Sequence, residues 1–141
     1  MNIQENGMSL PNKRLGKPPR VVVVDDDVYF RSVVAKAIEQ AQGQIVGEAA
    51  DGNEALRLCQ SLQPEWVFTD YEMPGLNGLE LVECLRVEGI ASKVAVISHS
   101  LNKQLENHFE KLQVEYFFHK RGFAINAFIR CLKRELFRLN G

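Results

Sequence analysis

The stretch Arg20-Val21-Val22-Val23-Val24-Asp25-Asp26-Asp27 decides how the rest of this sequence is interpreted. Four consecutive valines without polar alternation indicate a β-strand that is covered on both faces, as in the centre of a parallel sheet. The three acids that follow lie at the carboxyl end of that strand, where neighbouring negative charges repel one another unless a cation offsets them. We therefore expect a central strand with a charged site at its end.

Short β-branched or aromatic runs alternate with longer segments of helical period on the C-terminal side of this stretch. Such alternation is typical of βα units around a parallel sheet. It predicts an α/β domain with a doubly wound, five-stranded parallel sheet and helices on both faces. Gly43 and Gly89 are expected to end the first and third helices. The expected strands are 21–24, 45–50, 66–69, 94–97 and 116–118. The first helix is expected from apolar residues at 33, 34, 37, 38 and 41, and the other helices are expected at 54–62, 79–87, 102–112 and 125–139.

Length and composition are those of one globular domain. The 141 residues are 45% hydrophobic and 25% charged, which allows a real core. The net charge of −1 favours neither nucleic acid nor an anionic membrane as a partner. We expect a flexible, polar tail over residues 1–19 and the folded domain over residues 20–141.

Cysteine usage and the lack of a targeting signal indicate a cytoplasmic protein. Cys59, Cys84 and Cys131 are odd in number, lack CxxC spacing and fall inside apolar helical patterns, so we expect free thiols in a reducing compartment. The N-terminus lacks the apolar stretch of a secretion signal, and no run reaches the ~20 apolar residues that span a bilayer.

Polar side chains follow four of the expected strands where each strand ends. Asp25 and Asp26 follow the first strand, Asp70 the third, Ser98 the fourth and Lys120 the fifth. Ligands of doubly wound sheets bind at this edge. Oxygen ligands without a Cys or His set favour Mg²⁺ over zinc. The alternative for the acids after the first strand is a solvated turn that caps a helix, but a second acid at another strand end favours a site.

Together these residues resemble the response regulator receiver family, over residues 20–140. The resemblance rests on the acids after the first strand, the segment Thr69-Asp70-Tyr71-Glu72-Met73-Pro74-Gly75, Ser98 and Lys120. It implies a flavodoxin-like sheet with strand order 2-1-3-4-5. It also implies a role in two-component signalling, in which the domain accepts a phosphoryl group from a phosphohistidine donor in a Mg²⁺-dependent reaction.

The resemblance also implies roles for individual residues. Asp70 would be the phosphoacceptor, Lys120 would pair with it and later with the phosphoryl group, and the hydroxyl of Ser98 would follow that group. The implied Mg²⁺ ligands are Asp25 (largely through water), Asp26, Asp70 and the backbone carbonyl of Glu72, and Phe117 matches an aromatic switch position.

The implied partners are a sensor histidine kinase or phosphotransfer protein on one side and a downstream effector or fused output domain on the other. The switching surface would be the fourth helix, fifth strand and fifth helix, which could also pair two copies of the chain. We expect no membrane contact, no direct nucleic-acid binding by this domain, and no enzyme activity beyond self-phosphorylation from a donor and slow autodephosphorylation. The chain either acts alone or is the front domain of a longer protein.

The loops at the strand ends depart from the family pattern at two positions. Arg121 follows Lys120 where the family usually has proline, often after a cis bond. Because a cis bond before a non-proline residue costs about 2.5–4 kcal/mol, we predict a trans bond, a reshaped loop and a less ideal reach of Lys120 to Asp70. His99 replaces a small residue; it is either an exposed loop histidine or a ring that slows exchange of donor and water at Asp70.

Two further departures concern the fourth and fifth helices. Gln113-Val114 replaces a small pair, which predicts a different end for the fourth helix. The last helix is basic, which fits a docking or dimer face and a solvated face equally well. Its basic residues are Arg130, Lys133, Arg134 and Arg138, and its expected core residues are Phe128, Leu132 and Leu136.

Two other functions remain open. The run from Val24 to Val28 also fits the opening motif of a haloacid-dehalogenase-type phosphatase, with Asp25 as nucleophile and Asp27 as acid, although Asp70 would then have no task. A receiver-like binding module that works without phosphorylation is suggested by Arg121 and His99.

Overall fold

Residues 17–138 are described by a computed structural model, in which five parallel strands follow the order β2-β1-β3-β4-β5. The predicted fold class and strand order are confirmed. Residues 1–16 of the expected tail lie outside the described residues. The strands are β1 (Arg20–Val24), β2 (Gln44–Ala49), β3 (Trp66–Thr69), β4 (Lys93–Ser98) and β5 (Tyr116–His119). The helices are α1 (Val28–Gln40), α2 (Gly52–Leu62), α3 (Gly78–Val87), α4 (Lys103–Lys111) and α5 (Ile125–Cys131).

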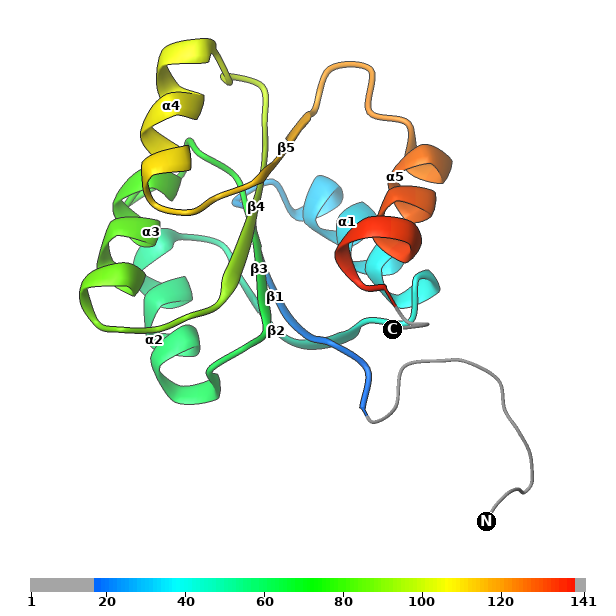
Figure 1. The fold of residues 1–141 in the computed structure, drawn as a ribbon, viewed down its shortest axis with the longest axis horizontal. Coiled ribbons are helices and arrows are strands. Elements are labelled where there is room, and N and C mark those ends of the chain that lie inside the picture. Colours follow the sequence, from blue (N-terminus) through cyan, green and yellow to red (C-terminus); the bar gives the residue numbers. More distant parts are fainter. Residues whose placement is uncertain (1–16, 139–141) are drawn as a thin grey trace.

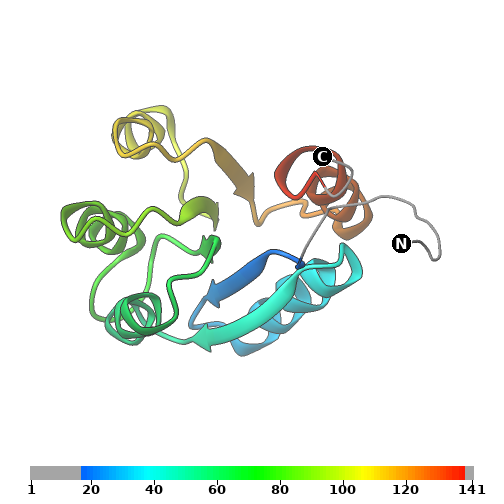
Figure 2. The same ribbon diagram turned by 60° about the horizontal axis from the view of Figure 1, so that its bottom comes forward.

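Helices cover both faces of the sheet: α1 and α5 lie on one face, and α2, α3 and α4 on the other (Figure 1, Figure 2). The valines of β1 alternate between the two cores. Val21 and Val23 pack in the core under α1 and α5, whereas Val22 and Val24 pack in the core under the other three helices. All four are at most 2% exposed, which confirms the prediction of a central strand covered on both faces.

Four helices begin directly after the loops at the carboxyl edge of the sheet, each with a side-chain cap. A cap of this kind satisfies a backbone N–H that has no partner within the helix. It fixes the residue at which each helix begins, and so anchors the helix end of each loop at this edge of the sheet. The capping residues are Asp27 for α1, Asp51 for α2, Asn77 for α3 and Asn102 for α4.

The end of α1 differs in detail from the prediction. Gln42, not Gly43, adopts the left-handed conformation, with φ 71°. Gly43 donates its N–H to the carbonyl of Ile38, and a Cβ on Gly43 would lie 2.6 Å from Ile38 Cγ2, so close packing excludes a side chain there. Gly89 ends α3 with φ +74°, as predicted.

The last helix is shorter than predicted. It continues from α5 into a π-helical segment, Leu132–Leu136, and residue 139 lies outside the described residues. Phe137 donates its N–H to the carbonyl of Leu132, which is the i to i+5 bond of a π-helix. The wider turn lets two consecutive residues, Leu136 and Phe137, enter the same core at 5% and 4% exposure. Phe128 and Leu132 also lie in this core, as predicted.

Candidate functional site

Two buried aspartates follow the central strands β1 and β3. The backbone N–H groups of Asp25 and Asp70 extend the ladder of the sheet, because each donates a 3.0 Å hydrogen bond to a neighbouring strand, at Ala49 and Val24 respectively. Asp25 is 4% exposed and Asp70 is 7% exposed. Buried carboxylates need a partner that offsets their charge.

Lys120 is that partner. It follows β5, and its Nζ lies 2.7 Å from Asp25 Oδ2 and 3.0 Å from Asp70 Oδ2. All described peptide bonds are trans, which confirms the prediction for Lys120–Arg121. The expectation that Lys120 would reach Asp70 less well without a proline is wrong, because the turn closed by the hydrogen bond from Phe123 N to Lys120 O still brings the amine to both carboxylates.

The charges in this trio depend on one another. Burial raises the pKa of Asp25, and the hydrogen bond from Lys120 offsets this only in part. Burial lowers the pKa of Lys120, but its hydrogen bonds to Asp25 and Asp70 outweigh burial and raise that pKa above its ordinary value. The amine therefore stays charged between the two acids.

The three acids after β1 divide three tasks among them. Asp25 is paired with Lys120, and Asp27 caps α1 by accepting the N–H of Phe30 at 3.1 Å. Asp26 is exposed, and its carboxylate has no partner within residues 17–138. Carboxylate oxygens of Asp25, Asp26 and Asp70 all lie within 4.8 Å of one another, a spacing that allows them to hold a metal ion. The capping and charged-site interpretations both apply, to different residues.

The loop after β3 is held tightly against Asp70. Tyr71 donates its N–H to Asp70 Oδ1 at 2.7 Å, and Gly78 donates to the carbonyl of Tyr71, also at 2.7 Å. A Cβ on Gly78 would lie 2.3 Å from the carbonyl oxygen of Asp70, so only glycine fits. No backbone N–H of residues 17–138 donates to the carbonyl of Glu72, which leaves that oxygen available to a ligand.

Ser98 and Phe117 join the site to the α4 side of the sheet. Ser98 is 1% exposed; its Oγ accepts the N–H of Ser100 at 3.2 Å, and its carbonyl accepts the N–H of Lys120 at 3.1 Å. Phe117 is half-buried, and its ring lies 6.1 Å from that of Phe109 in α4. Ser98 is therefore hydrogen-bonded both to the loop that leads into α4 and to Lys120.

The remaining candidates lie on the surface. His99 is exposed, next to Ser98, and so are the basic residues of the last helix, Arg130, Lys133, Arg134 and Arg138. Exposure fits both interpretations of each group. The three cysteines are free; Cys59 is buried and the other two are half-buried.

Sequence reasoning missed two residues of α1 that touch the site. Arg31 donates to the backbone carbonyl of Asp25 at 2.8 Å and to the carboxylate of Glu48 at 3.1 Å. The ring of Phe30 lies 4.8 Å from Lys120 Nζ. Both follow a capping residue at the start of a helix, a position that would have indicated proximity to the strand ends but not these partners.

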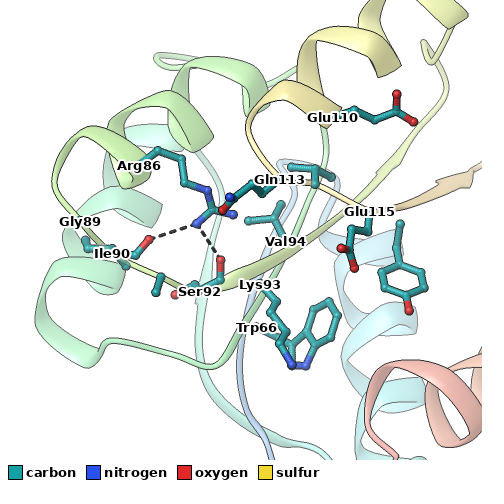
Figure 3. A pocket seen from close by; sticks show the side chains of 13 residues that line it. Trp66, Arg86, Gly89, Ile90, Ser92, Lys93, Val94, Glu110, Gln113 and Glu115 are labelled. Carbon is teal, nitrogen blue, oxygen red and sulfur yellow. Dashed lines mark hydrogen bonds between the residues drawn. The ribbon is translucent and has the colours of Figure 1, made fainter.

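A cleft of about 630 Å³ lies at the other end of the strands. Its walls include Trp66, Arg86 and Gln113 (Figure 3). Arg86 donates to the carbonyls of Ile90, Ser92 and Leu112 at 2.9–3.1 Å. These are structural hydrogen bonds to backbone, and none of the predicted site residues lies there, so the size of this cleft does not make it the site.

Residues 21–129 match the family model of the response regulator receiver domain. The nitrate/nitrite response regulator protein NarL of Escherichia coli is 33% identical over 89 residues, which cover 62% of this chain and 41% of the relative. Protein-glutamate methylesterase/protein-glutamine glutaminase 5 of Myxococcus xanthus is 39% identical over 82 residues, 57% of this chain and 24% of the relative. The chain therefore spans about two fifths or less of these curated relatives.

Solved receiver domains have the same architecture. The signal receiver domain of the putative response regulator NarL from Mycobacterium tuberculosis superimposes with a TM-score of 0.72 at 29% identity, covering 84% of this chain and 98% of that one. The response regulator domain of Thermotoga maritima CheB gives a TM-score of 0.70 at 28% identity, covering 86% and 92%. These matches give no support to the dehalogenase-type interpretation.

No helix within residues 17–138 is long and apolar enough to cross a membrane.

Proposed function

The chain belongs to the response regulator receiver family of two-component systems, and from that premise we propose that it takes a phosphoryl group onto Asp70 with the help of Mg²⁺. One observation carries this proposal. The carboxylate of Asp70 is buried at a strand end, 3.0 Å from the amine of Lys120 and among acids that lie within 4.8 Å of one another. An acceptor, a cation and a set of oxygen ligands thus meet at one point.

The residues present fit Mg²⁺. Three carboxylates lie close together and only two of them are paired with a lysine, which leaves an excess of negative charge that a divalent cation would offset. Asp26 and the carbonyl of Glu72 have oxygens without hydrogen-bond donors in the described part of the chain. Asp26, Asp70 and Glu72 would hold the ion directly and Asp25 largely through water. When bound, Mg²⁺ supplies positive charge to the oxygens of the incoming phosphoryl group.

The chemical step requires little from the protein besides position and charge. A carboxylate oxygen of Asp70 attacks the phosphorus, a new O–P bond forms, and the N–P bond to the donor imidazole breaks, so the electron pair leaves with the nitrogen. An ionised carboxylate has no proton to lose, so attack by this group needs no general base. Lys120 can turn its amine from Asp25 to the phosphoryl oxygens and offset their charge. Water slowly hydrolyses the resulting acyl phosphate.

Phosphorylation would then change the α4 side of the molecule. The hydroxyl of Ser98 can donate to a phosphoryl oxygen, and its movement would weaken the bond that Ser100 makes to Ser98 Oγ. Phe117 packs against Phe109 of α4 and can turn into the space that Ser98 leaves. A charge at Asp70 thereby reaches the surface formed by α4, β5 and α5.

The proposed partners follow from this chemistry. A sensor histidine kinase or phosphotransfer protein would be the donor, and an effector or fused output domain would contact α4, β5 and α5, a surface that could also pair two copies of the chain. The functional unit would be residues 20–141, acting in the cytoplasm.

Phosphoramidate, a small donor with an N–P bond, tests the proposal. We expect wild-type protein to gain one phosphoryl group only when Mg²⁺ is present, and Asp70→Asn to lose this uptake by at least about a hundredfold, because the attacking carboxylate is gone. Intact-mass spectrometry measures the uptake, and trapping of the acyl phosphate followed by peptide mapping locates it.

Asp51→Asn is the matched control, since Asp51 lies at the same edge, caps α2 and is replaced by an equally good cap. It should be phosphorylated like wild type. A label on Asp25, or normal uptake by Asp70→Asn, would contradict the proposal. If the protein neither binds beryllofluoride nor takes up a phosphoryl group from phosphoramidate, the result would instead favour a binding module that works without phosphorylation.

A further inference from the structure

Lys120 has a third neighbour besides its two carboxylates. The ring of Phe30, in the first turn of α1, lies with its centroid 4.8 Å from Lys120 Nζ. With Asp25 and Asp70 at 2.7 and 3.0 Å, the side chain of Lys120 is only 6% exposed. A cation at this distance is attracted to the face of an aromatic ring, and more strongly when water is excluded.

The backbone of Lys120 is joined to β4, because its N–H donates to the carbonyl of Ser98 at 3.1 Å, but the turn that follows it has few contacts of its own. Arg121 is exposed, and Gly122 adopts φ +70° with open space around the place of a side chain. One hydrogen bond, from Phe123 N to Lys120 O, closes the turn at 3.1 Å. Additional contacts therefore hold this turn in place beside the lysine side chain.

Phe30 and Phe123 provide such contacts. Their rings meet edge to face with centroids 5.2 Å apart, and Phe123 also packs on Phe128 of α5 at 5.0 Å. The aromatic pair thereby ties the loop after β5 to the start of α1 and to α5. Both rings are half-buried, so they also separate the amine from solvent.

We propose that Phe30, braced by Phe123, is a positioning residue that keeps the amine of Lys120 at Asp70 and lets it turn toward an arriving phosphoryl group. Carboxylates bind an ammonium group directionally, whereas the face of a ring attracts it without preference for one rotation. The amine of Lys120 can therefore exchange one oxygen partner for another while it stays against the ring of Phe30. This inference rests on the proposed function, because the phosphoryl oxygen is the partner toward which the amine turns.

Affinity for beryllofluoride, a phosphoryl mimic, separates positioning from general structure. We expect Phe30→Leu to weaken beryllofluoride binding about tenfold at saturating Mg²⁺, measured by fluorine NMR, because the amine is less well placed. Mg²⁺ affinity in the absence of the mimic should be unchanged, since the acids are intact. Phe30→Trp should restore beryllofluoride binding.

Pentafluorophenylalanine at position 30 tests the same contact in a protein that should still fold, because it keeps the ring while removing the negative charge of its face. It should weaken beryllofluoride binding as Phe30→Leu does. Tyr29→Leu is the matched control: Tyr29 is the neighbouring aromatic residue, 78% exposed, and its replacement should have no effect. Equal beryllofluoride affinity in wild type and the pentafluorophenylalanine variant would overturn the positioning role while leaving the proposed function intact. Absence of binding by wild type itself would overturn the proposed function and the positioning role with it.

Discussion

Each end of the sheet holds a buried or half-buried cation, and the two cations are bound in different ways. At the carboxyl ends of the strands, Lys120 lies between the carboxylates of Asp25 and Asp70. At the amino ends, the side chain of Arg86 donates to backbone carbonyls of residues 90, 92 and 112 and to no other group of residues 17–138. Burial lowers the pKa of Arg86, whereas the two carboxylates raise the pKa of Lys120 despite burial.

The difference indicates which end can switch. Side-chain carboxylates can change partners, gain a metal ion or gain a phosphoryl group, whereas backbone carbonyls belong to the fold and keep their places. Arg86 therefore joins the end of α4 to the loop between α3 and β4, whereas Lys120 has the proposed role of changing its partner. The cleft of about 630 Å³ lies at the Arg86 end of the strands, so in this protein the chemistry of the partners, rather than cavity size, points to the candidate site.

Removing the charge of Lys120 should have the largest effect on stability. Lys120→Met leaves two buried carboxylates uncompensated, and we expect the free energy of unfolding at neutral pH to fall by about 3 kcal/mol. Because Mg²⁺ can replace the lost charge, it should stabilise this variant more than it stabilises wild type. Urea unfolding with Mg²⁺ and with a chelator measures both effects, and equal stabilisation of the two proteins would show that Mg²⁺ does not replace the lost charge of Lys120.

Removing the charge of Arg86 should destabilise the protein less than removing that of Lys120. Arg86→Met deprives three carbonyls of a charged donor, and we expect a loss of about 2 kcal/mol because water in the cleft can solvate part of what is exposed. Phosphoryl uptake from phosphoramidate and the effect of Mg²⁺ on stability should match wild type. Arg57→Met, at an exposed arginine, is the control and should be nearly neutral. A slower uptake in Arg86→Met would show that the two ends are coupled.

The smallest effect is expected at the rim of the cleft. Gln113 lies just after α4 with φ 69°, in the left-handed region that favours glycine. Gln113→Gly should stabilise the protein by about 0.5 kcal/mol, since the relief of strain exceeds the added flexibility of the unfolded chain only slightly. The same substitution at Gln104, an exposed position within α4, should destabilise. Loss of stability in Gln113→Gly would contradict the strain argument.

Local pattern was sufficient to predict the strands and most helix positions, but helix ends depended on packing. The end of the last helix could not be predicted, because it depends on a π-helical turn that places Leu136 and Phe137 in the same core. Likewise Gln42 and Gln113 adopt left-handed conformations that a glutamine does not predict, because it is the fold that requires the chain to reverse there.

The sequence by itself determined the central strand of valines, the parallel sheet, and the set of acids, hydroxyl and lysine at its carboxyl edge. Periodicity and strand ends are local properties, so they can be read from neighbouring residues. Only the tertiary structure decided that Asp25 pairs with Lys120, that Asp27 caps a helix and that Asp26 stays free within the described residues. Lys120 and Asp70 are 50 positions apart, and such pairings depend on how whole elements pack.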